Sequence, residues 1–172
     1  PEIGGGGLFC SGRAIISNNT MVGNVAEEGG GVGLRGLGPF TFSGNIVAHN
    51  SSGIRLYTAT ATPVLVTNCI YNPGGTDYSG LTAGPGDISV DPQLLAAEYG
   101  EVHLKEGSPC INAGDDAAVH AGWVDLDGEP RIQGGRVDIG ADEFNGTTPS
   151  FTPRVIRVTR SGDDANDGSS WD

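Results

Sequence analysis

The six residues Ile16-Ser17-Asn18-Asn19-Thr20-Met21 recur as Phe42-Ser43-Gly44-Asn45-Ile46-Val47 and again as Val66-Thr67-Asn68-Cys69-Ile70-Tyr71. The equivalent positions 19, 45 and 69 lie 26 and 24 residues apart, and glycine-rich runs separate the three blocks. A repeat of about 25 residues is typical of solenoids. A unit this short cannot bury an apolar face by itself, so each unit must stack on its neighbours.

Short runs of β-forming residues alternate with turns of Gly, Asn, Asp and Ser, and helical periodicity is almost absent. We predict an all-β fold in which each repeat contributes about three strands. Parallel stacking then places equivalent residues about 4.8 Å apart. The predicted strands are 6–10, 14–17, 20–22, 31–34, 40–43, 46–48, 53–57, 64–67 and 70–71.

Asparagines recur at equivalent turn positions, where Asn19 aligns with Asn45 and Asn24 aligns with Asn50. Asparagine tolerates left-handed backbone in turns, and stacked amides can form hydrogen-bonded ladders between layers. We interpret these asparagines as structural. The cysteines at positions 10, 69 and 110 are expected to fill small apolar sites, although stacking could also bring two of them together.

The 172 residues include 30 glycines and carry a formal net charge of −12. Nucleic acid is therefore a poor partner, because phosphate contacts need clustered Lys and Arg. Divalent cations are plausible partners, since hard cations take carboxylate oxygens. No apolar run approaches the roughly 18 residues of a membrane span. The chain opens within a pattern at Pro1-Glu2-Ile3-Gly4, as expected for part of something longer.

The repeat is expected to end at Tyr71, with residues 1–86 forming the coils and a departing loop over 72–86. Residues 87–144 are expected to cap the coils, because a solenoid needs an atypical end that protects its exposed edge. Within the cap, 107–114 is predicted to form a short turn of helix closed by glycine.

The predicted cap contains an ordered series of motifs: Asp91-Pro92-Gln93-Leu94, Val102-His103-Leu104, Gly107-Ser108-Pro109-Cys110-Ile111-Asn112-Ala113-Gly114, Asp125-Leu126-Asp127-Gly128-Glu129-Pro130-Arg131 and Val137-Asp138-Ile139-Gly140-Ala141-Asp142-Glu143. This series resembles the C-terminal portion of bacterial choice-of-anchor Q proteins. The resemblance implies a right-handed parallel β-helix of the pectate-lyase-like superfamily and an extracellular or cell-surface location.

The C-terminal residues follow a different pattern. After a linker over 145–153, residues 154–159 form a predicted strand, and the following stretch to Trp171 resembles the start of a β-helix. We therefore predict a projecting strand that completes the first coil of a neighbouring copy, by a mode of association known for exposed sheet edges. Repetition head to tail gives a filament. The predicted interface residues are Arg154, Val155, Ile156, Arg157, Val158, Thr159 and Trp171.

Three other interpretations of this terminal segment remain open. The units could be joined covalently in tandem, the chain could fold as a permuted monomer, or the tail could be disordered. Further units in the same gene would favour the tandem arrangement.

Two oxygen-rich loops are candidate calcium sites. The first contains Asp125 and Asp127, with Asp138, Asp142 and Glu143 expected nearby, and the second contains Asp163, Asp164 and Asp167. The first loop lacks the further spacing of an EF-hand. In the alternative interpretation, these are turns whose Asp side chains accept hydrogen bonds from main-chain N–H groups.

The coils contain few groups suited to catalysis, because their acids are Glu2, Glu27 and Glu28 and no carboxylate pair is evident. Glycoside hydrolysis needs two carboxylates at a defined separation. We therefore expect a non-enzymatic extracellular structural protein. The alternatives are a carbohydrate-binding or polysaccharide-cleaving β-helix and an adhesin module of a tandem surface protein. Glycans are possible partners, and Asn18, Asn50 and Asn145 match the glycan acceptor pattern.

Overall fold

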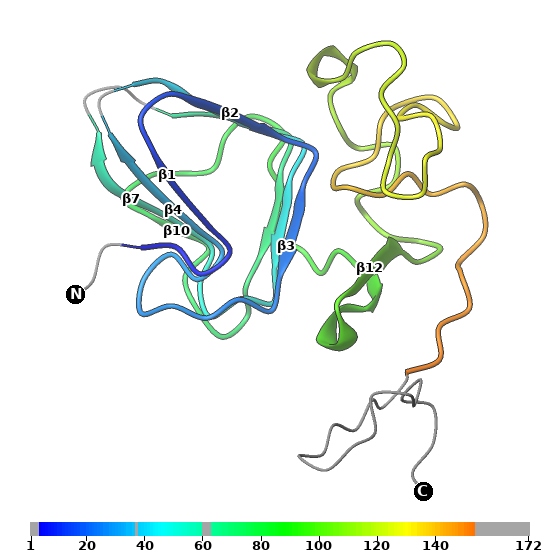
Figure 1. Ribbon diagram of the computed structural model, residues 1–172, viewed down its shortest axis with the longest axis horizontal. Helices are drawn as coiled ribbons and strands as arrows, with labels where there is room; N and C mark the ends of the chain where they lie inside the picture. Colours follow the sequence, from blue (N-terminus) through cyan, green and yellow to red (C-terminus); the bar gives the residue numbers. More distant parts are fainter. Residues whose placement is uncertain (1–3, 37, 60–62, 154–172) are drawn as a thin grey trace, which may run out of the picture.

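The computed structural model describes residues 4–36, 38–59 and 63–153 (Figure 1). Its regular elements are almost all strands, with two short 3₁₀ helices. They are β1 (Leu8–Ser11), β2 (Ala14–Ser17), β3 (Thr20–Val22), β4 (Val32–Gly36), β5 (Phe40–Ser43), β6 (Ile46–Ala48), β7 (Ile54–Ala59), β8 (Val64–Val66), β9 (Cys69–Tyr71), β10 (Tyr78–Ser79), β11 (Leu94–Ala96), η1 (Ala97–Tyr99), β12 (Glu101–Leu104) and η2 (Asp116–Ala118).

Ten of the strands form three parallel sheets, in the orders β1-β4-β7-β10, β2-β5-β8 and β3-β6-β9. In these sheets each strand from β4 onward pairs with the strand three places earlier in the chain. The groups β1–β3, β4–β6 and β7–β9 therefore make three successive layers. Figure 1 shows the three sheets on different sides of a shared interior. The prediction of an all-β fold with parallel stacking is confirmed.

The predicted strand positions agree closely with the structure, but the register of the third repeat is one residue off. Ile46 pairs with Cys69, so Asn45 lies over Asn68 rather than over Cys69. The same register pairs Phe42 with Leu65. Side chains alternate between the two faces of a strand, and this register keeps Leu65 in the buried interior.

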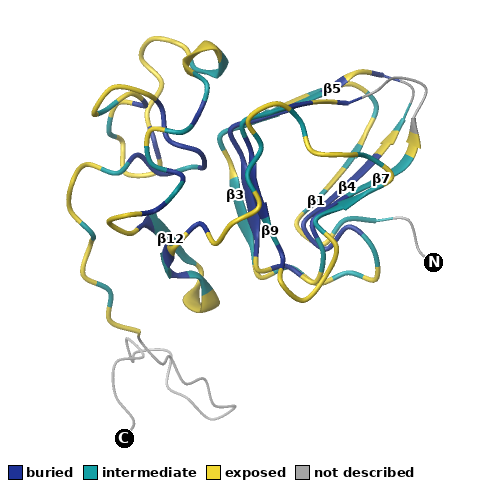
Figure 2. Cartoon of the chain, turned by 180° about the vertical axis from the view of Figure 1, so that it is seen from behind, coloured by how far each residue is buried: buried dark blue, intermediate teal, exposed yellow. Residues whose placement is uncertain are grey.

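The interior of the layers is built from aliphatic and aromatic side chains of all three sheets. Figure 2 colours the buried residues dark blue along the chain. Phe42 and Leu34 of the second layer are completely inaccessible to solvent. Burying a side chain of this size contributes about 1.5–3 kcal/mol. The buried members of this cluster are Val32, Leu34, Phe40, Phe42, Val47, Ile54, Leu65 and Ile70.

The prediction that the repeat ends at Tyr71 is wrong, because a partial fourth layer follows. β10 pairs in parallel with β7, and Ile88 forms a parallel bridge with Cys69. The glycine-rich, proline-containing stretch between them therefore continues the stacking instead of leaving it. We refer to residues 4–88 as the layered half and to residues 89–144 as the irregular half.

The irregular half has one short antiparallel pair, β11 with β12, the two 3₁₀ helices and two isolated antiparallel bridges, and its other described residues form turns and irregular chain. The predicted helical turn at 107–114 is not formed. Successive tight turns replace it, with Ile111 N–H donating to Ser108 and Ala113 N–H donating to Cys110. Asn112 adopts a left-handed backbone conformation (φ 53°), which prevents a continuous helix.

The irregular half packs against the sheet β3-β6-β9 (Figure 1). Gly140 N–H donates to the Gly44 carbonyl, and a side chain at Gly140 would meet Ile46 at 2.6 Å. Glycine is therefore needed at this contact. The second apolar cluster joins the two halves through Ile46, Ala48, Cys69, Leu94, Leu104, Cys110 and Ile139. The described residues contain no helix whose length and apolar character would let it cross a membrane.

Candidate functional site

The first layer leaves one end of the stack open. Within the described residues, β1, β2 and β3 each form the outermost strand of their sheet and have a partner on one side only. Their inward-facing side chains are half-buried, whereas the side chains directly below them in the second layer are fully buried. We call these half-buried side chains the upper end. They are Leu8, Cys10, Ala14, Ile16 and Met21.

Register pairing shows how different the two layers are. Ile16 pairs with Phe42, and Met21 pairs with Val47, yet only the second-layer residue of each pair is inaccessible to solvent. An apolar interior that stops at half-buried side chains can gain stability from one further layer. The unpaired backbone edge above these side chains can accept a strand by main-chain hydrogen bonding.

Two ladders of side-chain amides run through the layers, as predicted for Asn19 with Asn45 and Asn24 with Asn50. In the first ladder, N–H and Nδ2 of Asn19 donate to Oδ1 of Asn45 at 3.0 and 3.1 Å. Asn45 donates in the same way to Asn68 at 3.0 and 3.2 Å. Asn68 donates to Asp87 Oδ1 at 2.8 and 2.9 Å. A carboxylate only accepts, so Asp87 ends the ladder.

The second ladder repeats this arrangement at the next turn. Asn24 donates to Asn50, Asn50 donates to Asn72, and Asn72 donates to Asp77. Both ladders therefore have a direction and end in Asp at the fourth layer. At the opposite end of the ladders, no described residue donates to Oδ1 of Asn24 or to Oδ1 of Asn19. The ladder ends at Asp77 and Asp87 were not predicted, because they lie 5 and 19 residues after Asn72 and Asn68, spacings that do not follow the repeat.

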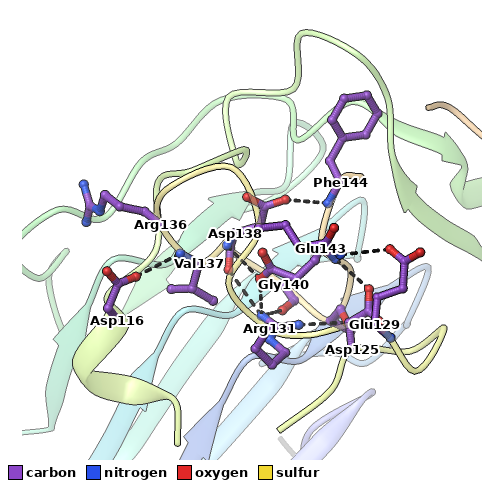
Figure 3. A network of polar contacts seen from close by, with 12 residues as sticks. Asp116, Asp125, Glu129, Arg131, Arg136, Val137, Asp138, Gly140, Glu143 and Phe144 are labelled. Carbon is purple, nitrogen blue, oxygen red and sulfur yellow. Dashed lines mark hydrogen bonds and ion pairs between the residues drawn. The ribbon is translucent and has the colours of Figure 1, made fainter. Parts of the chain in front are cut away.

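The predicted calcium ligand Asp125 is buried and already bonded to main chain. Its Oδ1 accepts from the N–H groups of Asp127 and Glu129 at 2.9 and 2.8 Å, and its Oδ2 accepts from Glu143 N–H at 3.1 Å. Figure 3 shows this carboxylate within a wider polar network. The geometry corresponds to the alternative interpretation, an Asp that organises a turn. Asp127 points elsewhere, as described below.

Arg131 lies at the centre of the network in Figure 3. Its guanidinium donates to the carbonyls of Ala141 and Gly140, both at 2.9 Å, and lies 3.2 Å from the Glu143 carboxylate. Burial raises the pKa of Glu143 to about 8, despite the neighbouring Arg131. Burial also raises the pKa of Asp138, whose two oxygens accept from the N–H groups of Asn112 and Phe144.

A second polar cluster surrounds His103 on β12. Nδ1 of its ring contacts Glu101, and Nε2 lies 2.9 Å from Oδ2 of Asp127. Burial opposes protonation of this ring, but hydrogen bonds to Glu101 and Asp127 outweigh it and raise the pKa of His103. Burial likewise opposes ionisation of Glu101, yet its bonds to His103 lower the Glu101 pKa. The motif Val102-His103-Leu104 was recognised in the sequence, but no role was predicted for His103.

Two of the cavities between the described residues combine acidic and basic side chains in their linings. The larger, of about 420 Å³, has His49, Asp91, Glu98 and Lys105 in its lining, and His49 lies 3.7 Å from Asp91. The other, of about 200 Å³, is lined by Glu27, Glu28 and Arg55 among others. Arg55 lies 3.5 Å from Glu28, so these charges partly compensate each other.

The cysteines are all free thiols. Cys69 and Cys110 lie in the same apolar cluster, one in each half of the chain. A hydrogen bond with Cys69 and burial raise the pKa of Cys110, so this thiol is held in its neutral, unreactive form. The expectation that cysteines fill apolar sites agrees with the positions of these two residues.

Several predicted site residues lie outside the described part of the chain. They are the second calcium loop, Asp163, Asp164 and Asp167, and the interface residues Arg154, Val155, Ile156, Arg157, Val158, Thr159 and Trp171. Of the glycan acceptor positions, Asn50 is buried and serves as a ladder amide, so it is not available to a glycan. Asn145 is exposed.

Comparison with known families gives one partial match. A family model described as "Disaggregatase related" matches residues 48–120, fewer than half of the 172 residues. The match runs from the end of β6 into the irregular half. A search of curated proteins and a search of solved structures gave no match. The resemblance to choice-of-anchor Q proteins stays a prediction.

Proposed function

We propose that the chain is a non-enzymatic structural unit of an extracellular or cell-surface protein, with a right-handed parallel β-helix as its body. In this proposal the terminal strand 154–159 of one copy covers the first layer of the next, and repetition builds a filament. The observation that supports it is the upper end, where five inward-facing side chains are half-buried directly above fully buried ones.

The chemistry of the terminal segment suits this role. Val155, Ile156 and Val158 supply apolar side chains to a strand, and Arg154, Arg157 and Arg160 place three of the nine basic residues within seven positions. The whole chain has a net charge of −12, so the part without these three arginines is more acidic than the chain as a whole. A basic strand is therefore drawn electrostatically to another copy, which favours productive encounters.

The energetic gain comes from two sources. Completing the burial of half-buried aliphatic side chains contributes roughly 1 kcal/mol for each. Main-chain pairing along the open edge adds hydrogen bonds whose net contribution is about 0.5–1.5 kcal/mol each. Association also costs translational and rotational freedom, so the proposed joint gains most if the donated strand is already extended.

The test removes residues 154–172 and follows assembly by light scattering and electron microscopy. We expect the full chain to form elongated assemblies and the shortened chain to remain as single units. A full-length Ile156→Asp variant should also remain as single units. Ile132→Asp, at an exposed position in the irregular half, should assemble normally. Assembly that persists unchanged without residues 154–172 would refute strand donation.

A covalent tandem array would use the same contact between successive units of one chain. The two arrangements differ in the size of the natural protein under denaturing conditions. A single unit of this length favours the filament, whereas a chain several times longer favours the tandem array and an adhesin-like role.

The second candidate is a carbohydrate-binding or carbohydrate-cleaving module. Two observations favour it: the family description "Disaggregatase related" has the form of an enzyme name, and the cavity of about 420 Å³ combines His49, Asp91, Glu98 and Lys105. Calorimetric titration with neutral and acidic polysaccharides tests this candidate. Binding that Glu98→Gln and His49→Ala abolish would support it over the structural role.

A further inference from the structure

We propose that His103, Asp127 and Asp142 form a binding site for a divalent transition-metal ion such as Zn²⁺ or Mn²⁺. One ligand atom from each residue lies within 4.8 Å of the other two. A first-row metal binds nitrogen and oxygen ligands at about 2.0–2.2 Å, so neighbouring ligand atoms around one ion lie about 3–4 Å apart. Nε2 of His103 and Oδ2 of Asp127, 2.9 Å apart, are already close to this spacing.

The three ligands come from three different segments. His103 lies on β12, Asp127 lies in the turn that begins at Asp125, and Asp142 lies in the segment that carries the Arg131 partners. Main-chain bonding fixes two of these segments, because Asp142 Oδ2 accepts from Leu104 N–H at 2.7 Å and Asp125 holds the turn. The site is therefore assembled by the fold before any ion arrives.

The histidine is held in the orientation that metal binding requires. Its Nδ1 contacts Glu101, which leaves Nε2 facing Asp127. A carboxylate that accepts from the second ring nitrogen is the usual support of a metal-bound histidine, because it fixes both the tautomer and the ring plane. Glu101 is thus a positioning residue, and Nε2 is the ligand atom.

The charge at this position favours a divalent ion over a proton. Three carboxylates, those of Glu101, Asp127 and Asp142, surround one imidazole. A proton on Nε2 would neutralise one of them and leave the cluster with two uncompensated negative charges. A divalent cation in place of that proton compensates two of the three charges, leaves only one, and binds all three ligands at once.

A small cavity of about 10 Å³ is lined by His103, Asp127 and Asp142 together with residues of the 143–149 segment. This volume is close to that of a single water-sized probe, so it admits one ion or water and no organic ligand. The nitrogen ligand makes zinc or manganese a better fit than calcium, which prefers six to eight oxygens. The inference does not depend on assembly of the chain.

The test uses the full chain, freed of metal by a chelator and then dialysed. We titrate it with ZnCl₂, MnCl₂ and CaCl₂ by isothermal calorimetry and record the thermal midpoint with each ion. We expect one zinc or manganese ion per chain, a raised midpoint, and calcium binding at least ten-fold weaker than zinc binding.

Asp127→Asn is the most informative variant, because Asp127 is exposed and its loss leaves the surrounding main-chain bonds intact. It should weaken zinc binding at least ten-fold and remove the shift of the midpoint. His103→Gln should do the same, and Glu101→Gln should weaken binding about 10- to 100-fold. His120→Ala, an exposed histidine beside Trp123, is the matched control and should bind zinc normally.

Three results would overturn the inference. They are no binding of zinc or manganese by the unaltered chain, calcium binding tighter than zinc binding, and zinc binding that Asp127→Asn leaves unchanged.

Discussion

The layered half and the irregular half bury polar groups of opposite kinds. In the layered half the buried polar side chains are mainly neutral asparagines, repeated at the same two turns of each layer. In the irregular half they are mainly ionisable residues, including Asp125, Arg131 and Glu143, and none of them repeats. The two halves thus satisfy main-chain hydrogen bonds by different chemistry.

This difference follows from what each half must do. A stacked layer offers its neighbours the same groups at every level, so an amide that both donates and accepts can continue indefinitely. A chain that ends the stacking must satisfy irregular turns, and carboxylates suit this because one oxygen accepts several N–H groups. Asp77 and Asp87 mark the transition, since each ends an amide ladder with a carboxylate.

The largest expected effect comes from removing a buried ionisable residue, the kind of residue that distinguishes the irregular half from the layered half. Arg131→Met removes the guanidinium donor of the Gly140 carbonyl and of the buried Glu143 side chain, whereas the Ala141 carbonyl still accepts from Leu126 N–H. Each buried acceptor left without a donor costs about 1–3 kcal/mol, so we expect a loss of about 2–6 kcal/mol. Urea unfolding measures the loss, and hydrogen exchange should show that the irregular half opens first. Lys105→Met, an exposed cation of the same half, should change stability by less than about 0.5 kcal/mol. Equal losses for both variants would contradict the central role of Arg131.

The second prediction compares two leucines in adjacent layers. Leu34→Ala removes a fully buried side chain and should cost about 2–5 kcal/mol. Leu8→Ala, at the upper end, should cost no more than about 1.5 kcal/mol in single units, because Leu8 is only half-buried. The unfolding free energies of the shortened chain, which lacks residues 154–172, give both values. A loss at Leu8 equal to that at Leu34 would mean that the first layer is already covered.

The third prediction compares the two ladder ends. Asp87→Asn should cost about 1–3 kcal/mol, because its Oδ2 also accepts from the Tyr78 hydroxyl and from Gly84 N–H, where an amide NH₂ would repel the donor. Asp77→Asn keeps the Oδ1 that Asn72 needs and should cost less than about 0.5 kcal/mol. Thermal unfolding of the two variants tests the comparison. The reverse order of losses would contradict the assigned ladder ends.

The fourth prediction concerns pH and is measured as a slope of stability. The pKa of Glu143 rises from 4.5 to about 8 in the folded chain. The folded state therefore holds a proton that the unfolded state releases, and the stabilisation is present below pH 4.5 and lost as the pH rises towards 8. One such group changes stability by at most about 1.4 kcal/mol per pH unit. Glu143→Gln should flatten this slope in unfolding experiments with a chelator present. An unchanged slope would mean that Glu143 is ionised throughout.

Repetition explains which parts of the fold could be predicted from the sequence. β2, β3, β5 and β6 lie at their predicted positions, because period-two alternation and regular turn residues determine strands locally. The register at Cys69 was one residue off, since the third repeat is shorter and the turn residues Thr67 and Gly44 look unlike. Burial of Leu65 decides that register, and burial depends on the whole layer.

The irregular half could not be derived in this way, because its contacts join residues without periodic spacing. The carboxylate of Asp125 was correctly suspected of organising its turn as an alternative to binding calcium. Its neighbour Asp127 instead faces His103, 24 positions earlier. Nothing in the spacing of these residues predicts that contact, which depends on how β12 packs beside the turn.

The most direct test of the proposed function is hydrogen exchange of β1, β2 and β3 in the full chain at increasing protein concentration. If the terminal strand of another copy covers the first layer, amides on the open edge of these strands become protected at the concentrations where assemblies appear. Protection of β4–β6 should stay constant. Assemblies that leave the first-layer amides unprotected, or that protect only the irregular half, would contradict the account.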